Sequence, residues 1–465
     1  PTDPWLIYTA EQMNTIGLYT EDWDKHFRLM ADIDLAAFRG TDFNIIGRYR
    51  YQEEYAPFSG TFDGNGRTIS NFTYSTPDVN DIAMFAFVGS SDATITNLGL
   101  IDPNVNAGTG NSVASLVGNM SGGGIGGCYV RGGRILGNDW VGGLVAYNSG
   151  TITDCYSSAE VAGLTDAGGL VGCNWGTITD CNSFNSVSGI KSIGGLAGNN
   201  EGKILDSYSV GQVVGDRVAG GLVGWSWGLV RNCGSEGNVI GAIDDIGGLV
   251  GRSYGEVSNC YATGSVSGLD VVGGLVGRSH GSITNSYSTS EVIGAEAGSN
   301  TIGGLVGDSR GSIATCYSAG SVSADAIVGG LVGISRETIM NSYSTASVIG
   351  GSRVGGLAGH TRGTIMNCYA AGSVTGDSWV GGLVGWDETG QVDSIVASFW
   401  DIQTSGQTTS DGGLGMTTAE MQSAVTFLNA RWDFVDETEN GVEDFWWINE
   451  ALDYPRLSWE VNEGD

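Results

Sequence analysis

The stretch Ile246-Gly-Gly-Leu-Val-Gly251 decides the fold, because its Gly-Gly-Leu core recurs ten times between residues 142 and 385. Successive copies of the leucine are 26, 26, 26, 27, 26, 30, 26, 26 and 26 residues apart, at Leu144, Leu170, Leu196, Leu222, Leu249, Leu275, Leu305, Leu331, Leu357 and Leu383. A fixed period of about 20–50 residues is typical of a chain that stacks one small unit on the next. Such repetition specifies an architecture well and a chemistry poorly.

One copy of the repeat, from Ile246 to Val272, contains three short β-type runs separated by turn residues, and none has a helical period. Its third run alternates small or apolar residues with polar or aromatic ones: Cys260, Ala262, Gly264 and Val266 against Tyr261, Thr263, Ser265 and Ser267. Because side chains alternate across a strand, we expect the first set to face inward and the second outward. The sequence therefore predicts an all-β protein, a single-stranded parallel β-solenoid or β-helix with coils of about 26 residues and small helical caps at both ends.

Six of the eight cysteines share one place in the repeat, which Ser207, Ser286 or Ser342 fills in other copies. A position that accepts cysteine or serine favours a small buried side chain, so we expect free thiols. The residue before this position is Asp154, Asp180, Asp206, Asn232, Asn259, Asn285, Thr315, Asn341 or Asn367. Asn and Asp tolerate a left-handed backbone, so these residues predict a corner of the coil.

Both ends of the chain depart from the repeat, which divides it into an N-terminal cap and entry coil (1–82), a β-solenoid (83–395) and an aromatic-rich C-terminal cap (396–465). A capping box at Thr9 predicts a helix through about Leu18, and a second one at Thr417 predicts a helix through about Asn429. Strand-like runs lie at 33–35 and 43–46, and tight turns are expected at 58–66. The aromatic residues between 432 and 459 favour the plug of a terminal core, and a sugar site is the alternative.

The composition limits the partners. The chain has a net charge of −31 with only 20 Lys and Arg among 465 residues, which disfavours nucleic acid and anionic membranes. It has no apolar stretch long enough for a membrane span, so we expect no membrane insertion. The acidity and the repeats favour a secreted, extracellular or cell-surface protein, and we interpret the chain that begins at Pro1 as a mature one whose export signal is gone.

The Gly-Gly-Leu-Val-Gly core followed by Ile-x-Asn-Cys-Tyr-Ser resembles the bacterial GLUG repeat, over about residues 113–390. GLUG repeats occur in large secreted or surface proteins, including some adhesins and non-catalytic parts of certain peptidases. The resemblance implies a β-solenoid with an extracellular role and implies no reaction. The sequence contains no protease zinc motif that would support a peptidase.

Two outward rows are candidate binding surfaces. The first is a tyrosine row, Tyr156, Tyr208, Tyr261, Tyr287, Tyr317, Tyr343 and Tyr369, with Tyr129 at its start. It would bind sugars or proteins, or it would be a stacking ladder that stiffens the coils. The second is a ridge at the turns after Gly-Gly-Leu, with Trp175, Trp227, Tyr254, His280, Arg310, Arg336 and Arg362 at its tips. Arginine beside aromatic residues suits carboxylated or sulfated glycans or an acidic face of another copy, unless these tips are simply solvated.

Acidic residues are expected at the turns opposite this ridge: Asp166, Asp216, Asp244, Asp245, Asp270, Asp325 and Asp377. Their oxygen atoms give a weak signal for calcium, but no known calcium motif is present, so we predict neither a cofactor nor a structural metal. The three histidines match no nucleophile or metal motif, so we predict no catalytic residues and no enzyme.

The sequence thus predicts an extracellular structural or adhesive solenoid, acting as a scaffold or self-assembling filament subunit. Its expected partner is a second copy of itself or an extracellular glycan. The alternative is a carbohydrate-binding or polysaccharide-cleaving β-helix, for which carboxylates near residues 310–362 would be the place to look.

Overall fold

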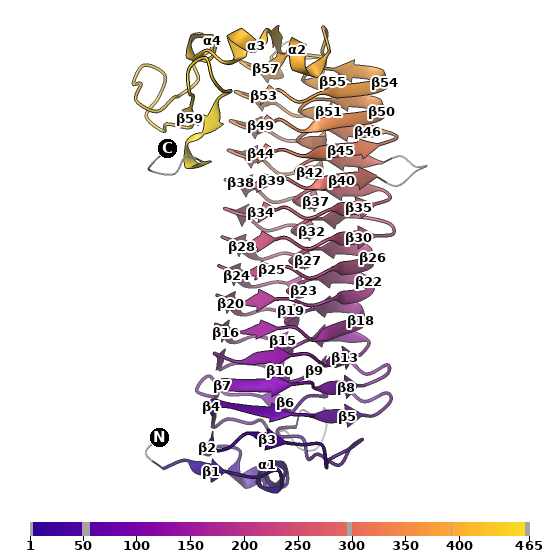
Figure 1. Cartoon of the computed structure of the whole chain (residues 1–465), viewed down its shortest axis with the longest axis vertical. Helices are drawn as coiled ribbons and strands as arrows, with labels where there is room; N and C mark the ends of the chain where they lie inside the picture. The colour runs from indigo at the N-terminus through magenta and orange to yellow at the C-terminus, as the bar shows by residue number, and fades with distance from the viewer. Residues whose placement is uncertain (1–2, 49–55, 295–299, 392, 461–465) are drawn as a thin grey trace. The chain divides into compact units, whose positions relative to one another are not determined.

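The computed structural model describes residues 3–48, 56–294, 300–391 and 393–460, which belong to two compact units, Pro1–Asn238 (unit 1) and Val239–Asp465 (unit 2). Each unit is a stack of parallel β-coils (Figure 1). The described helices are short: α1 (Ala10–Ile16) and the 3-10 helix Thr20–Asp22 in unit 1, and α2 (Ile402–Ser405), α3 (Thr418–Met421), α4 (Ala424–Asn429) and the 3-10 helix Ser458–Glu460 in unit 2. The predicted parallel β-solenoid with coils of about 26 residues is confirmed.

Each coil contributes strands to three sheets, which we name the valine sheet, the GGL sheet and the tyrosine sheet. In unit 1, one coil runs through β18 (Glu160–Gly168) of the valine sheet, β19 (Val171–Asn174) of the GGL sheet, and β20 (Thr177–Thr179) and β21 (Asn182–Ser183) of the tyrosine sheet. In unit 2, one coil runs through β35 (Val266–Gly268) and β36 (Val271–Gly273), then β37 (Val276–Ser279), then β38 (Ile283–Thr284) and β39 (Tyr287–Ser288).

The GGL sheet follows the repeated motif directly. Its strands in unit 1 are β6 (Phe85–Val88), β10 (Val117–Met120), β15 (Val145–Asn148), β19, β23 (Ala197–Asn200) and β27 (Val223–Ser226). In unit 2 they are β32 (Val250–Ser253), β37, β42 (Val306–Ser309), β47 (Val332–Ser335), β51 (Ala358–Thr361) and β55 (Val384–Asp387). All of these pairings are parallel, with the first residue of each strand opposite the first residue of the next in the motif copies.

The motif leucines form the centre of the core. Leu144, Leu170 and Leu196 are completely buried, and each donates its backbone N–H to the carbonyl of the next leucine at 2.9–3.0 Å. The second glycine of the motif lets neighbouring coils touch: a Cβ on Gly195 would lie 2.1 Å from the carbonyl oxygen of Gly221. The repeat therefore combines an apolar residue that fills the core with glycine where two backbones meet.

The cysteine row is buried as expected, and all eight cysteines are free thiols. The thiol of Cys181 lies 3.1 Å from the carbonyl oxygen of Thr179, and Ser207 donates to the carbonyl of Leu205 at 2.7 Å in the same place of the next coil. Burial raises the pKa of Cys316 and of Cys368 to about 12, so these thiols stay protonated at neutral pH.

The corner before the cysteine row is also confirmed. The nine Asp, Asn and Thr residues predicted to bend the chain all have left-handed backbone, with φ between 45° and 54°. The run after each cysteine is, however, not one strand as its alternation suggested. In the Ile246–Val272 copy it divides into β34 (Tyr261–Ala262) of the tyrosine sheet and β35 of the valine sheet, because the chain bends at 263–265.

The N-terminal segment follows the prediction in part. Helix α1 has the predicted capping box between Thr9 and Gln12, and β3 (Ile33–Asp34) lies where a strand was expected. Ile46 of the predicted 43–46 strand makes only an isolated bridge to Phe85. The turns predicted at 58–66 are wrong, since residues 61–66 belong to β4 (Thr61–Ser70), which bends at an irregular register between Asp63 and Arg67.

The C-terminal helix predicted from Thr417 to Asn429 is divided in two. The capping box of Thr417 and Glu420 opens α3, but α3 ends at Met421 and α4 begins at Ala424. Residues 399–401 form β57, which continues the tyrosine sheet, and β58 (Leu414–Met416) pairs with it. The last coil of unit 2 is thus extended by β58 before the helices begin.

A buried asparagine ladder, which was not predicted from the sequence, stabilises unit 1. The side-chain amide of Asn148 donates to the Asn174 side-chain oxygen at 2.7 Å, Asn174 donates to that of Asn200 at 2.8 Å, and Asn200 donates to the Ser226 hydroxyl at 3.0 Å. Buried amides of this kind stabilise a fold only when they are paired, so the ladder reinforces the register of the GGL sheet.

The coil contact at Gly195 gives a direct test of the fold. We expect Gly195→Ala to destabilise the protein by about 1–3 kcal/mol, because the new methyl group meets the Gly221 carbonyl and the Ser209 side chain and cannot be accommodated without a shift. Chemical unfolding followed by circular dichroism measures this difference. The matched control is Gly126→Ala, where the nearest atom is 3.9 Å from the new Cβ, and equal stability of the two variants would refute the close contact.

Candidate functional site

The outer face of the GGL sheet in unit 2 gathers most of the charged and aromatic residues of the predicted ridge. Its outward residues are in register from coil to coil: Arg252, Arg278, Asp308, Ile334, His360 and Trp386. The turn tips beside them are Tyr254, His280, Arg310, Arg336, Arg362 and Glu388. The structure therefore brings the predicted ridge residues of unit 2 together on one face.

Two buried carboxylates neutralise the arginines of this face. Asp245, whose side chain is fully buried, pairs with Arg252 and lies 3.3 Å from Arg278. Asp308 lies 3.5 Å from Arg278, 3.2 Å from Arg310 and 2.9 Å from Arg336. Burial raises the pKa of Asp245, and the charges of Arg278 and Arg252 oppose that rise.

This arrangement corrects the expected separation of an acidic and a basic ridge. Asp245 was assigned to the turns opposite the arginines, but it lies at the end of the valine sheet against Arg252 and Arg278. The reason is the left-handed backbone at Asp245, with φ of 49°, which places its side chain beside the GGL sheet. Asp245 therefore pairs with Arg252 and Arg278 of its own chain, so these charges are not available to pair with another molecule.

The histidines of the ridge are held by stacking. Tyr254 and His280 stack with ring centroids 4.3 Å apart, and an Arg310 nitrogen lies 3.5 Å from Nε2 of His280. Burial and the charge of Arg310 lower the pKa of His280. His360 stacks on Trp386 at 4.7 Å, and burial and Arg362 lower its pKa as well. Both rings are therefore neutral at physiological pH.

Unit 1 carries the other part of the predicted ridge, and there it is aromatic rather than basic. Trp175 and Trp227 are 56% and 50% exposed at turn tips two coils apart. Trp227 stacks on Trp225 at 6.4 Å, and the Lys191 ammonium lies 5.4 Å from the centroid of Trp225. In unit 1 the ridge is thus a set of exposed indole rings with one associated cation.

The tyrosine row is a stacking ladder in unit 2, and of its described rings in unit 1 only the first two stack. In unit 1, Tyr129 and Tyr156 stack at 5.0 Å with planes 4° apart, and Phe184 lies between Tyr156 and Tyr208 with edge-on contacts. In unit 2 the row is continuous from Tyr261 to Tyr369. The centroids of successive rings are 4.9–5.6 Å apart and their planes lie within 14° of each other. This spacing follows from the distance between neighbouring parallel strands.

The C-terminal segment covers much of this row in unit 2. The indole of Trp459 stacks on Tyr287 and Tyr317, and its N–H donates to the Thr315 carbonyl at 3.1 Å. Tyr343 donates to the Glu460 carboxylate at 2.8 Å, and Tyr369 donates to the Pro455 carbonyl at 2.6 Å.

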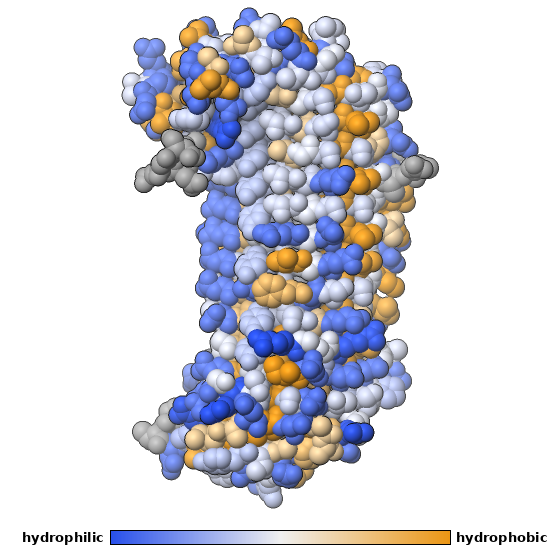
Figure 2. Space-filling model, viewed as in Figure 1, coloured by the Kyte–Doolittle hydropathy of each residue, from blue (hydrophilic) through white to orange (hydrophobic). Residues whose placement is uncertain are grey.

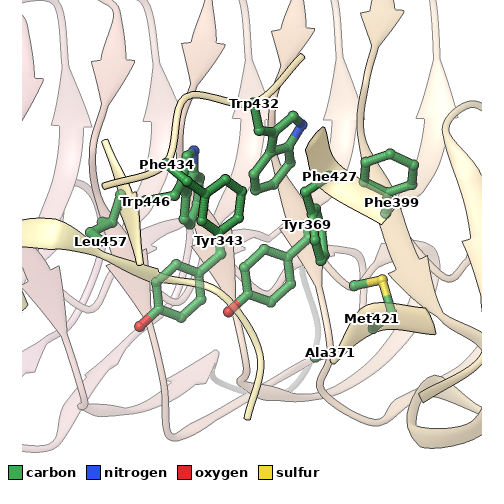
Figure 3. Close-up of a cluster of buried hydrophobic side chains, with 10 residues drawn as sticks. All are labelled: Tyr343, Tyr369, Ala371, Phe399, Met421, Phe427, Trp432, Phe434, Trp446 and Leu457. Atoms are coloured by element: carbon green, nitrogen blue, oxygen red, sulfur yellow. The ribbon is translucent and has the colours of Figure 1, made fainter. Parts of the chain in front are cut away.

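The aromatic residues of the cap form a buried core on the outside of the tyrosine sheet. Figure 3 shows Trp432, Trp446 and Phe427 packed over the rings of Tyr343 and Tyr369. The aromatic cap is thus a packed core, as the plug interpretation expected, but part of it is built on the tyrosine row. Burial raises the pKa of Tyr343, and Tyr343 and Tyr369 are not available to an external ligand in this structure.

Other candidate features do not converge on a reaction centre. Unit 1 has an apolar cavity of about 350 Å³ lined by residues that include Trp5, Ile16, Tyr19 and Phe27. The His26 ring contacts the Thr61 hydroxyl at 2.8 Å. Within the described ranges, no three His, Cys, Asp or Glu side chains are placed to share a metal ion. Of the other predicted acidic residues, Asp216, Asp325 and Asp377 are exposed, and Asp166, Asp244 and Asp270 are partly buried.

Two parts of this face were not predicted from the sequence. The first is the pairing of Asp245 and Asp308 with the arginines, although Asp308 follows Val-Gly in its copy and is visible there as a departure from the pattern. The second is the pair Arg353 and Trp379, which precede Val-Gly-Gly-Leu in two successive copies and lie beside Trp386.

The fold and these faces define a repeat protein of the β-solenoid class. The family described as the GLUG motif matches residues 141–162, 245–267, 270–293 and 350–375. The chain therefore contains GLUG-motif repeats, and the matched residues lie within the β-solenoid.

Two curated relatives share part of this sequence. Halomucin of Haloquadratum walsbyi is 31% identical over 167 residues, which cover 35% of this chain and 2% of halomucin. A protein of Evansella cellulosilytica, provisionally described as a Gly-rich membrane protein, is 32% identical over 101 residues, 21% of this chain and 11% of that protein. The similarity thus spans only a small part of either relative.

A solved structure, from Bacteroides ovatus and provisionally described as an immunoglobulin A1 protease, aligns over 98% of this chain and 93% of its own. Its identity is 18% and the TM-score is 0.23. No helix in the described part of this chain is both long enough and apolar enough to cross a bilayer.

The shared carboxylate of Asp308 can be tested by substitution. We expect Asp308→Asn to lower the free energy of unfolding by about 1–3 kcal/mol, because three arginines lose a buried ionic partner while they remain partly exposed to water. Denaturant unfolding measures the change. Glu337→Gln removes the same charge from an exposed position of a neighbouring turn and serves as control, and an equal effect of both changes would rule out a specific role for Asp308.

Proposed function

We propose that this chain is an extracellular structural scaffold that acts without catalysis and associates with further copies of itself. The proposal depends on one observation: many charged, phenolic and thiol side chains of the chain are paired or covered by other residues of the same chain. Asp308 is shared by three arginines, Tyr343 and Tyr369 are covered by the cap, and all eight thiols are buried. Arginines paired with carboxylates of the same chain, covered tyrosines and buried thiols support a role in stable display rather than in chemistry.

An extracellular location is supported by composition and by similarity. A net charge of −31 keeps the protein soluble and separates it from nucleic acids and anionic lipids. The sequence is similar to halomucin over 167 residues. The buried, uncrosslinked thiols are compatible with this location because their pKa is raised and water does not reach them.

Self-association is supported by apolar side chains on the valine sheet. In unit 2, successive coils present Ile240, Ser267, Ile293, Ser323 and Ile349 at one outward position. The three isoleucines are 40–58% exposed. In Figure 2, separate hydrophobic patches lie over the strands that Figure 1 labels β35 to β54 (Val374–Gly381). An apolar row that recurs on alternate coils suits side-by-side packing against the same row of a second copy.

Sedimentation velocity over a range of protein concentrations tests this function. We expect reversible association that increases with concentration and is weakened by Ile293→Lys combined with Ile349→Lys, since two charges would then be buried at the contact. Leu414→Lys is the matched control, because Leu414 is equally exposed (59%) but lies on β58 of the tyrosine sheet.

Two results would contradict the proposal. A protein that remains monomeric at all concentrations would exclude self-association. Release of reducing ends from a polysaccharide by the purified chain would exclude a purely structural role and favour the polysaccharide-cleaving alternative.

A further inference from the structure

A second cluster on unit 2 differs from the neutralised arginine face. Arg353 lies at the end of β50 (Ser347–Gly355), Trp379 in β54 (Val374–Gly381) and Trp386 in β55. The guanidinium carbon of Arg353 is 4.2 Å from the ring centroid of Trp386 and 5.4 Å from that of Trp379. The two indoles are nearly parallel, with centroids 6.2 Å apart, and His360 stacks on Trp386. Two aromatic rings therefore hold one cation in place.

Arg353 keeps its hydrogen-bonding capacity. The ridge arginines 252, 278, 310, 336 and 362 each lie within 4.0 Å of a carboxylate, whereas Arg353 has no such carboxylate among the described residues. Its Nε is buried and makes no hydrogen bond to any described group. A guanidinium has five N–H donors in a planar fork that matches a carboxylate, so Arg353 is a cation prepared for an external anion.

Trp379 offers the accompanying surface. Its side chain is 61% exposed although its ring is fixed by Arg353 and Trp386. Its backbone is left-handed, with φ of 50°, as are the backbones of Trp140, Asp166, Ser192 and Val218 at the equivalent positions of unit 1, so this conformation belongs to the repeat. The exposed indole of Trp379 is therefore held in one orientation by its contacts with Arg353 and Trp386.

The surrounding charges leave Arg353 as the cation of this cluster. Glu388 accepts a hydrogen bond from Arg362 at 2.6 Å and lies 2.8 Å from His360, so its charge is already compensated. The ring of His360 is buried and its pKa is lowered by burial and by Arg362, so it adds no charge at neutral pH. An anionic ligand would thus meet one oriented positive group beside one exposed indole.

We propose that Arg353, Trp379 and Trp386 form a binding site for a uronic-acid residue of an acidic polysaccharide. The apolar face of the sugar ring packs on Trp379, and the carboxylate accepts hydrogen bonds from the Arg353 guanidinium. A bidentate contact to a planar carboxylate explains why arginine rather than lysine lies on the two rings. The site lies beside the predicted ridge but uses none of the arginines predicted there, and it does not depend on self-association.

Titration calorimetry of the whole chain with an oligogalacturonate tests the site. We expect saturable binding that Trp379→Ala and Arg353→Lys each weaken at least about tenfold, since the first removes the stacking surface and the second removes the planar fork but retains the charge. The fully methyl-esterified oligomer, which has no free carboxylate, is expected to bind wild type at least about tenfold more weakly. Near-UV circular dichroism establishes that both variants are folded.

The control is Trp175→Ala, which removes a comparably exposed indole from unit 1 and leaves affinity unchanged if the assignment is correct. The proposal is overturned if wild type shows no saturable binding, if Trp175→Ala weakens binding as much as Trp379→Ala, or if Arg353→Lys binds as tightly as wild type. Equal or tighter binding of a sulfated galactan oligomer without uronate would overturn the carboxylate assignment.

Discussion

The contact between successive coils is the constraint on which the rest of this molecule depends. At the Gly-Gly step, a Cβ on Gly195 would collide with the carbonyl of the next coil, and the adjacent leucines link the coils through backbone hydrogen bonds of 2.9–3.0 Å. Once this contact fixes the register, every other position of the repeat is placed directly over its counterpart. Leucines, cysteines, asparagines and tyrosines therefore form rows, and the chemistry of each unit is the chemistry of those rows.

The rows differ in where their polar and charged side chains find hydrogen-bond or ion-pair partners. The asparagine ladder of unit 1 pairs each buried amide with the next, so its polar atoms are satisfied inside the GGL sheet. The arginine face of unit 2 is satisfied by Asp245 and Asp308, and much of the tyrosine row by the C-terminal segment. In the cluster of Arg353, Trp379 and Trp386, by contrast, one guanidinium lies against two indole rings with no described carboxylate within 4.0 Å.

The sequence was sufficient for the parts that repeat. The period of the motif predicted the solenoid, the Asp and Asn residues before the cysteines predicted left-handed corners, and both capping boxes are present. The sequence did not predict contacts made by single residues that depart from the repeat. The pairing of Asp245 with Arg252 depends on a left-handed residue that turns its side chain toward the GGL sheet, and the cover over Tyr343 depends on Trp446 from a segment about a hundred residues later. Neither contact has a local signal, because each joins positions with different roles in the repeat.

Hydrogen–deuterium exchange of the native chain, read by mass spectrometry on overlapping peptides, tests the coil-to-coil contact most directly. The account predicts that the Gly-Gly-Leu peptides around Leu170, Leu196, Leu305 and Leu331 exchange slowest, because each leucine N–H is bonded to the next coil. The irregular segment 436–444 should exchange much faster. Fast exchange of the Gly-Gly-Leu peptides, at the rate of that segment, would contradict the stacked register and with it the placement of every row.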